Sequence, residues 1–90
     1  MTWKATIEIE RYCRDIIEEP RTYWDSGACW LSDGTEQELE ALFNSEINLI
    51  EVTSDTYTIE VWFDDEPSDV EIKDMDSSIR KIIKIEEVGE

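Results

Sequence analysis

The chain has 90 residues, of which 24 are Asp or Glu, 8 are Lys or Arg and none is His, so its formal net charge is −16. This length corresponds to one small domain, residues 1–90, and a hydrophobic fraction of 40% with four Trp is enough to build a folded core. Without His the usual general base and the usual partner of a nucleophilic Ser or Cys are missing, so we expect no enzymatic activity.

The first segment, Thr2–Tyr12, alternates apolar and polar residues and predicts a half-buried strand. It contains no apolar stretch of the kind that forms a signal peptide, and no apolar run in the chain approaches the length of a membrane span. We therefore expect a cytoplasmic protein that does not contact a membrane. Residues 13–19 fit either a short helical turn or a continued strand, and Pro20 ends either one.

Residues 21–34 contain two glycines and no clear period, which predicts mostly loop. Large aromatic side chains are mostly buried, so we expect the rings of Tyr23, Trp24 and Trp30 to fold back over the core. Cys13 and Cys29 do not have metal-ligand spacing. In a chain without an export signal, they are expected to be free buried thiols, with a disulfide as the alternative.

Residues 35–44 give the clearest helical pattern in the chain. Thr35 followed by Glu38 matches a capping box, and an apolar stripe at helical spacing follows them at Leu39, Leu42 and Phe43. The next two segments, 47–53 and 56–63, are rich in β-branched and aromatic residues, which predicts two strands joined by a turn at residues 54–55. On the second strand, Glu60 and Trp62 lie opposite the apolar face.

Residues 64–76 form an acidic connection that can be read in two ways. Pro67 suits the start of a short helix, whereas Val70 and Ile72 suggest a brief strand. Residues 77–88 also fit either element, but their Ile content favours a strand. Arg80, Lys81 and Lys84 suit the edge of a sheet. The order then predicts an α+β fold: a mainly antiparallel sheet of four to five strands with one or two helices.

If residues 67–76 are helical, the order becomes β-α-β-β-α-β with an insertion at 13–34. That order is ferredoxin-like. The alternative reading, with a strand at 70–72, leaves one helix in the domain.

The acidic residues are concentrated in the middle of the chain. Residues 22–72 hold fourteen carboxylates and no Lys, Arg or His, so they carry −14 of the net charge. With so many carboxylates, no particular pair identifies a catalytic site. The densest run, 64–69, lacks the Gly that a calcium loop needs at its turn. We therefore expect no metal and no cofactor.

A solvated acidic surface, or adaptation to high salt, would explain part of this charge. The basic-free segment, however, crosses several elements, which favours one surface built for a partner. Carboxylates one helical turn apart, such as Glu36 and Glu40, are about 5–6 Å apart at Cβ. Phosphate-binding Lys and Arg side chains can close on groups at that spacing.

In size, net charge and absence of catalytic residues, the chain resembles the small acidic inhibitors that phages use against bacterial defence systems, the anti-CRISPR and anti-restriction proteins. Many of these imitate DNA. The resemblance implies a stoichiometric inhibitor that acts in the host cytoplasm and binds the basic nucleic-acid site of a CRISPR effector or restriction enzyme, but not nucleic acid itself. The residues expected to bind this partner are Glu36, Glu40, Glu60, Trp62, Asp64, Asp65, Glu66, Asp69, Glu71, Asp74 and Asp76.

Trp62 is expected to serve as an aromatic anchor or to lie under a loop. Two other functions are consistent with the same charges. One is an immunity protein or antitoxin that neutralises a basic nuclease toxin. The other is an accessory subunit that docks on a basic protein without inhibiting it.

Overall fold

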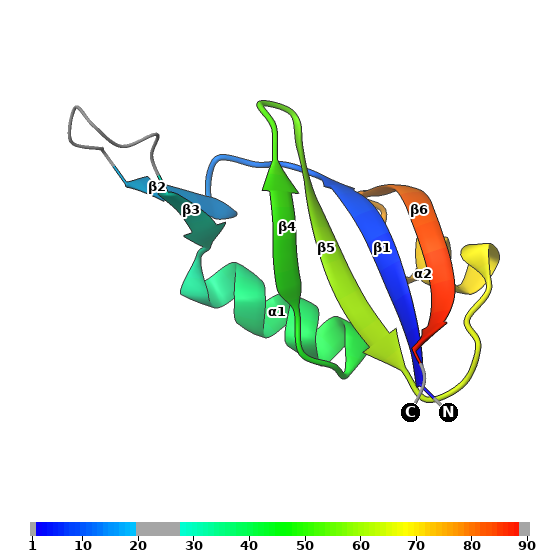
Figure 1. The fold of residues 1–90 in the computed structure, drawn as a ribbon. Helices are drawn as coiled ribbons and strands as arrows, with labels where there is room; N and C mark the ends of the chain where they lie inside the picture. The colour runs from blue at the N-terminus through cyan, green and yellow to red at the C-terminus, as the bar shows by residue number, and fades with distance from the viewer. Residues whose placement is uncertain (1, 20–27, 89–90) are drawn as a thin grey trace.

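A computed structural model describes residues 2–19 and 28–88. The elements in chain order are β1 (Thr2–Glu10), β2 (Ile16–Glu19), β3 (Ala28–Leu31), α1 (Asp33–Phe43), β4 (Asn48–Val52), β5 (Thr56–Phe63), α2 (Asp69–Met75) and β6 (Ile79–Val88) (Figure 1). Four strands form an antiparallel sheet in the order β4-β5-β1-β6, and β2 pairs with β3 in a separate hairpin. The fold is α+β, as predicted.

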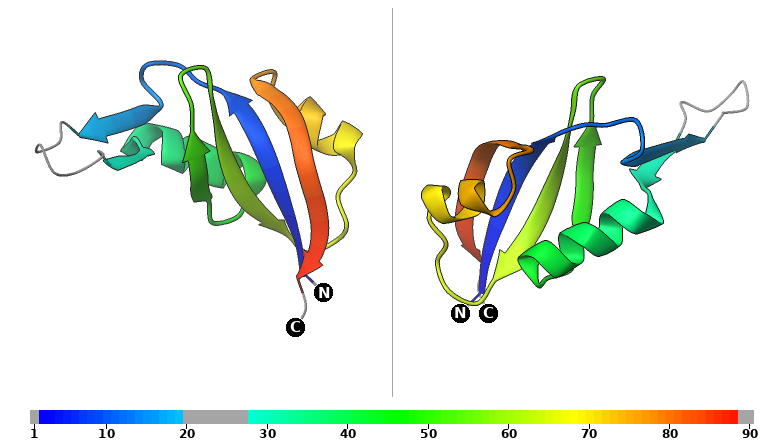
Figure 2. Two further views of the ribbon diagram at one scale, coloured as in Figure 1. Left: turned by 45° about the horizontal axis from the view of Figure 1, so that its top comes forward. Right: turned by 180° about the vertical axis from the view of Figure 1, so that it is seen from behind.

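Apart from the hairpin, the elements follow the order β-α-β-β-α-β, and β5 lies between β4 and β1 in the sheet. This is the ferredoxin-like arrangement, and the β2–β3 hairpin occupies the insertion predicted at 13–34. Both helices lie on the same face of the sheet, so the opposite face is not covered by a helix (Figures 1 and 2). The hairpin projects beyond the β4 edge of the sheet (Figure 1).

The core lies between the sheet and the two helices, and β1 runs through its centre. Its alternation, read from the sequence, directs Ala5, Ile7 and Ile9 into the core, where each is at most 1% exposed. Ile7 pairs in register with Ile59 of β5 on one side and Ile82 of β6 on the other. Because two-residue periodicity places alternate side chains on one face, three strands contribute to a single apolar layer.

Helix α1 begins earlier than the sequence predicted. The N-cap is Ser32, whose backbone is extended and whose side chain accepts a hydrogen bond from the Thr35 main-chain N–H at 3.4 Å. The predicted cap, Thr35, lies instead in the first turn and is buried. The prediction was wrong because two possible caps lie three residues apart, and tertiary burial of Thr35 decides between them. Asn44 ends the helix in the left-handed conformation, with φ of 53°.

Replacing Ser32 with alanine is expected to lower the free energy of unfolding by about 1 kcal/mol, because the cap hydrogen bond is lost. The Ser32 hydroxyl also donates to Thr35 Oγ1 at 2.9 Å, and that contact is lost too. Urea denaturation followed by circular dichroism measures the change. Ser54→Ala, at an exposed turn, serves as the control. Equal effects of the two substitutions would show that Ser32 does not cap the helix.

The acidic connection contains a helix, so the helical reading of this segment is confirmed for Asp69–Met75. Ser68 caps α2 in a reciprocal arrangement: its Oγ accepts from the Glu71 N–H at 3.2 Å, and Glu71 Oε1 accepts from the Ser68 N–H at 3.1 Å. Pro67 therefore precedes the cap and is buried, rather than opening the helix. Residues 79–88 form the edge strand β6, as predicted.

The hairpin was not predicted, because β3 falls in a segment read as loop. Its base is held by Ile16 and Leu31, which are paired in register and each 6% exposed. The alternation of a strand then directs Ile17 and Trp30 outward, and they are 41% and 42% exposed. The prediction that Trp30 folds over the core is therefore wrong. Tyr23 and Trp24 lie outside the described residues.

Candidate functional site

The C-terminal end of α1 meets the C-terminal end of β5. The rings of Phe43 and Phe63 pack edge to face, with centroids 6.2 Å apart and planes at 83°. The Trp62 main-chain N–H donates to Ser45 Oγ at 3.0 Å. These contacts place the end of α1 beside the segment that begins after Phe63. We call this region the acidic end, and its carboxylates are Glu40, Glu46, Asp64, Asp65, Glu66 and Glu71.

A surface hollow of about 440 Å³ lies at the acidic end. Its apolar lining comes from Phe63, Pro67, Ile72 and Met75, of which Ile72 is fully buried. Its acidic lining comes from Asp64, Asp65, Glu66 and Glu71. A Lys or Arg side chain has a matching character, because its aliphatic stem can cover apolar surface while its charged head reaches a carboxylate.

Most carboxylates of the acidic end lack a cationic partner. Within residues 2–19 and 28–88, Glu40, Glu46, Asp64, Asp65 and Glu66 form no ion pair. Glu71 makes the capping contacts at Ser68, which do not neutralise its charge. Charges of one sign that are crowded together repel each other, and a cationic partner relieves that repulsion.

Four other residues that were predicted to bind the partner lie on or next to the helices but do not line the hollow at the acidic end. Glu36 is one turn before Glu40 on α1, and it is half-buried. Asp69 and Asp74 are exposed on α2. Asp76 follows the last residue of α2 and accepts a hydrogen bond from the Ser78 main-chain N–H at 3.1 Å. It lines a different hollow, so the structure separates Asp76 from the acidic end.

Glu60 and Trp62 lie on the sheet face that no helix covers. There Lys4 sits on the neighbouring strand, and its Nζ lies 3.1 Å from Glu60 Oε2 and 3.3 Å from Glu86 Oε2. Lys84 Nζ is 3.4 Å from Glu86 Oε1. Glu60 also accepts a hydrogen bond from the Asn48 side-chain amide at 2.9 Å. Glu60 is therefore neutralised within the protein, unlike the carboxylates of the acidic end.

The pKa values on this face follow from the network. The Asn48 amide and then Lys4 hold the pKa of Glu60 below its ordinary value, against the opposing effect of desolvation. Lys4 and then Lys84 lower the pKa of Glu86 in the same way. Because both pKa values are lowered in the folded state, the stabilisation is present at neutral pH and is lost as the pH falls through the folded-state values.

Replacing Lys4 with methionine is expected to raise the pKa of both carboxyl groups toward their ordinary value. The rise should be larger for Glu86, whose main partner is Lys4, than for Glu60, which keeps the Asn48 hydrogen bond. Carbon-13 NMR titration of the side-chain carboxyl groups measures both values. Lys81→Met is the matched control, since Lys81 lies on β6 and makes no ion pair among the described residues. An equal effect of the control would contradict this network.

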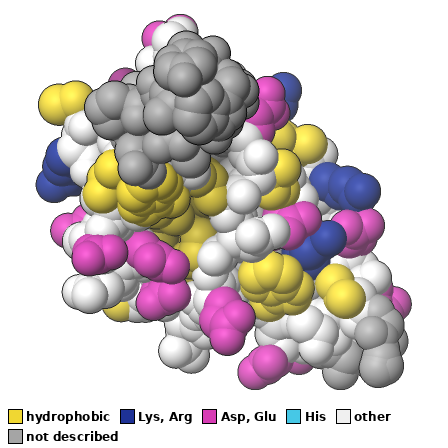
Figure 3. All heavy atoms as spheres, turned by 60° about the vertical axis from the view of Figure 1, so that its left-hand side comes forward, with side chains coloured by type: hydrophobic (Ala, Val, Ile, Leu, Met, Phe, Trp, Pro, Cys, Tyr) yellow, Lys and Arg dark blue, Asp and Glu magenta, His cyan; other side chains and the backbone are white. Residues whose placement is uncertain are grey.

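The face that includes the β2–β3 side of the molecule presents both apolar and acidic groups. Figure 3 shows hydrophobic side chains at its centre and several Asp and Glu side chains on its lower part, while Lys and Arg side chains lie at its left edge and on its right half beside further Asp and Glu side chains. Sequence reasoning missed two candidate binding features of the molecule: the exposed Glu46, which follows the end of α1, and the exposed pair formed by Ile17 and Trp30. The pairing of the short apolar runs 16–17 and 29–31 could have indicated the second.

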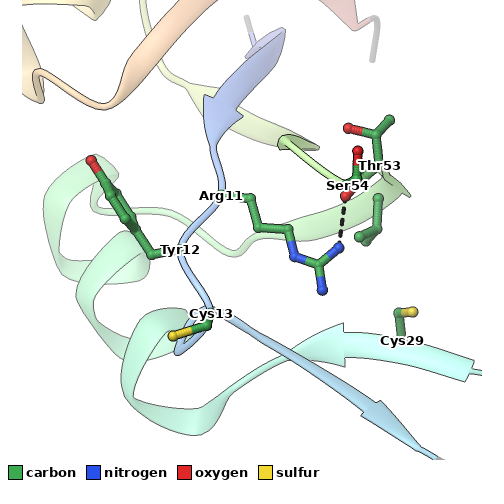
Figure 4. A pocket seen from close by; sticks show the side chains of 7 residues that line it. Arg11, Tyr12, Cys13, Cys29, Thr53 and Ser54 are labelled. Carbon is green, nitrogen blue, oxygen red and sulfur yellow. Dashed lines mark hydrogen bonds between the residues drawn. The ribbon is translucent and has the colours of Figure 1, made fainter.

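A separate hollow of about 620 Å³ lies where β1 ends, between the two hairpins. Arg11 extends across it, and its Nη1 donates to the Thr53 carbonyl at 2.7 Å (Figure 4). Cys13 and Cys29 line it from different segments, and their sulfurs do not point toward each other (Figure 4). Both thiols are free, as predicted, but both are exposed. The prediction that they are buried is wrong, because only the base of the hairpin reaches the core.

Within the described part of the chain, no group of three or more His, Cys, Asp or Glu residues is placed to hold a metal ion. Neither helix of that part has the length and apolar character needed to cross a membrane. No family model, curated protein or solved structure matches the chain. The fold and charge define a small acidic ferredoxin-like domain.

Proposed function

We propose that the protein is a non-catalytic, stoichiometric inhibitor whose acidic end occupies the positively charged nucleic-acid site of a partner protein. One observation supports this proposal above the others: the hollow at the acidic end combines carboxylates that have no cation among the described residues with an apolar floor. A basic groove that binds phosphates offers the complementary Lys and Arg side chains.

The partner class follows from the charge and the size of the chain. A nucleic-acid site carries clustered Lys and Arg, which an anionic protein can bind in place of phosphates. We assign the partner to the bacterial defence complexes, a CRISPR effector or a restriction enzyme, because the chain resembles their small acidic inhibitors. Nucleic acid itself is not a ligand, since two polyanions repel each other.

The proposal requires that salt weakens binding of the partner and that the partner cannot bind this protein and nucleic acid at the same time. Immobilised protein is incubated with bacterial lysate at about 50 mM and about 500 mM NaCl, conditions between which exposed ion pairs become screened. We expect the partner to be captured at low salt and lost at high salt. One equivalent of the protein should then prevent the captured partner from binding duplex DNA. Capture that does not depend on salt, or a ternary complex with DNA, would contradict the proposal.

The identity of the captured partner separates the related functions. A defence nuclease supports the inhibitor, and a toxic nuclease supports an immunity protein or antitoxin. The exposed pair of Ile17 and Trp30 favours a second candidate function, an accessory subunit. Trp is enriched where proteins contact each other, and this pair lies on the hairpin rather than among the residues of the acidic end. A partner that keeps its full activity in the complex would support that candidate.

A further inference from the structure

A second hollow, of about 350 Å³, lies on the helix side of the sheet, away from the residues of the acidic end. Helix α1 contributes Thr35, Glu38, Leu39 and Leu42 to its lining, and β5 contributes Tyr57. The turn before β2 adds Asp15, and the turn before β6 adds Asp76. Two connections, one helix and one strand therefore line a single site.

Tyr57 presents a hydroxyl group in this hollow whose hydrogen bonding is not satisfied by the fold. Its side chain is 2% exposed and lines the hollow, yet its hydroxyl makes no hydrogen bond among the described residues. Among the described residues, every side-chain oxygen or nitrogen that is fully inaccessible to solvent has a hydrogen-bond partner. The hydroxyl must therefore remain accessible, and the hollow is its opening. A buried tyrosine hydroxyl usually has a hydrogen-bond partner, so this one is available to a ligand.

The charges around the hydroxyl are mainly negative. Burial raises the pKa of Tyr57 above its ordinary value, and the charges of Asp15 and Asp76 raise it further. Asp15 is 5% exposed, and its carboxylate accepts from the Tyr12 N–H at 3.1 Å and from Thr35 Oγ1 at 3.2 Å. Arg14 also lines the hollow, and its Nε lies 3.5 Å from Asp15 Oδ1, although its side chain is 73% exposed. Three carboxylates and one guanidinium therefore line the hollow, and the carboxylates of Glu38 and Asp76 make no ion pair among the described residues, so the net negative charge favours a cation over an anion.

The arrangement of acceptors suits one kind of cation. Glu38 comes from α1, Asp76 from the turn before β6 and Tyr57 from the sheet, so the acceptors that line the hollow belong to three separate elements. Five N–H donors in a rigid plane match acceptors that are spread in this way, whereas an ammonium group is a compact point charge. Leu39 and Leu42 supply apolar lining for the stem of such a ligand. We propose that this hollow is a binding site for a guanidinium group, with Tyr57, Glu38 and Asp76 as its acceptors.

The guanidinium can belong to an arginine side chain of a protein or to a free small molecule, and the chemistry of the site is the same for both. The site also does not depend on the proposed function, because it shares no residue with the acidic end. N-acetyl-arginine amide is the probe for the first experiment, with the citrulline amide of the same shape as the uncharged control. Proton–nitrogen NMR of the full chain follows the binding of each compound.

We expect a Kd on the order of 1 mM for the arginine compound. Its chemical shift changes should be largest at the residues that line this hollow and smaller at the acidic end, where no tyrosine hydroxyl lines the surface. The citrulline compound should produce none. Tyr57→Phe should weaken binding by roughly tenfold, since it removes one hydrogen bond to a charged group. Glu38→Gln should weaken it similarly. Asp33→Asn, which also removes a carboxylate from α1 but at an exposed position outside the lining, should leave it unchanged.

Three results would overturn the site: equal binding of the citrulline compound, larger shifts at the acidic end than at the residues of this hollow, or unchanged binding by both Tyr57→Phe and Glu38→Gln. The spectrum of each free variant shows that it is folded. The second experiment measures the affinity of the captured partner for Tyr57→Phe. If Tyr57→Phe lowers the affinity for the partner, the guanidinium belongs to an arginine of that partner. If the affinity is unchanged, the ligand is a free compound. If no partner exists, the proposed function fails while the probe experiment still decides the site.

Discussion

Replacing Ile7 with alanine lowers the free energy of unfolding by about 3–4 kcal/mol, the largest change in stability that we expect from any single truncation in this domain. Ile7 is fully buried at the centre of β1. Its register partners are Ile59 on one side and Ile82 on the other, so a cavity at this position lies between two further strands. The surrounding sheet is continuous there, and it can relax only partly to fill the space.

The effect is large in proportion to the whole, because domains of this size are stabilised by only about 5–15 kcal/mol. Urea denaturation monitored by tryptophan fluorescence measures the change. Val70→Ala is the matched control, since Val70 lies on α2 and is 68% exposed; its effect should stay within about 0.5 kcal/mol. A loss at Ile7 no larger than the loss at Val70 would show that β1 does not occupy the centre of the core.

The central sheet could be predicted from the sequence because its long strands alternate apolar and polar residues over several repeats. Each of β1 and β5 alternates over most of its length, and that alternation identifies the apolar side chains that face the core. The short hairpin could not be predicted in this way. Only four residues form each of its strands, and which of the neighbours Trp30 and Leu31 is buried depends on how the hairpin packs beside β4. The N-cap at Ser32 was missed for the same tertiary reason.

The sequence predicts that the candidate site is acidic, but it does not predict where on the fold the site lies. The sequence shows that the middle of the chain is acidic, yet Glu60 and Asp64, only four positions apart, have different environments. The strand register puts Glu60 beside Lys4, which comes from the other end of the chain. Asp64 follows the end of the same strand, and no described residue of a neighbouring strand pairs with it. Because register joins residues that are distant in sequence, composition cannot separate neutralised carboxylates from unpaired ones.

The difference between neutralised and unpaired carboxylates determines where reversing a charge should weaken binding of the partner. Changing Asp64 and Asp65 together to lysine should weaken binding of the basic partner by roughly 100-fold or more at low salt, because two attractive contacts become repulsive. Both residues are exposed and lie in a connection, so the fold should be retained. The free energy of unfolding should even rise slightly, since the net negative charge falls. Surface plasmon resonance with the captured partner measures the affinity and both rate constants.

The matched control is the double substitution of Glu8 and Glu51 to lysine. It changes the net charge by the same amount, but both residues flank Thr58 on the sheet face that no helix covers. If the acidic end is the docking site, the control acts only through the overall field and slows association by less than about tenfold, with dissociation unchanged. Equal losses from the two variants would mean that the partner responds to the total charge of the molecule. In that case the hollow at the acidic end would not be where it docks.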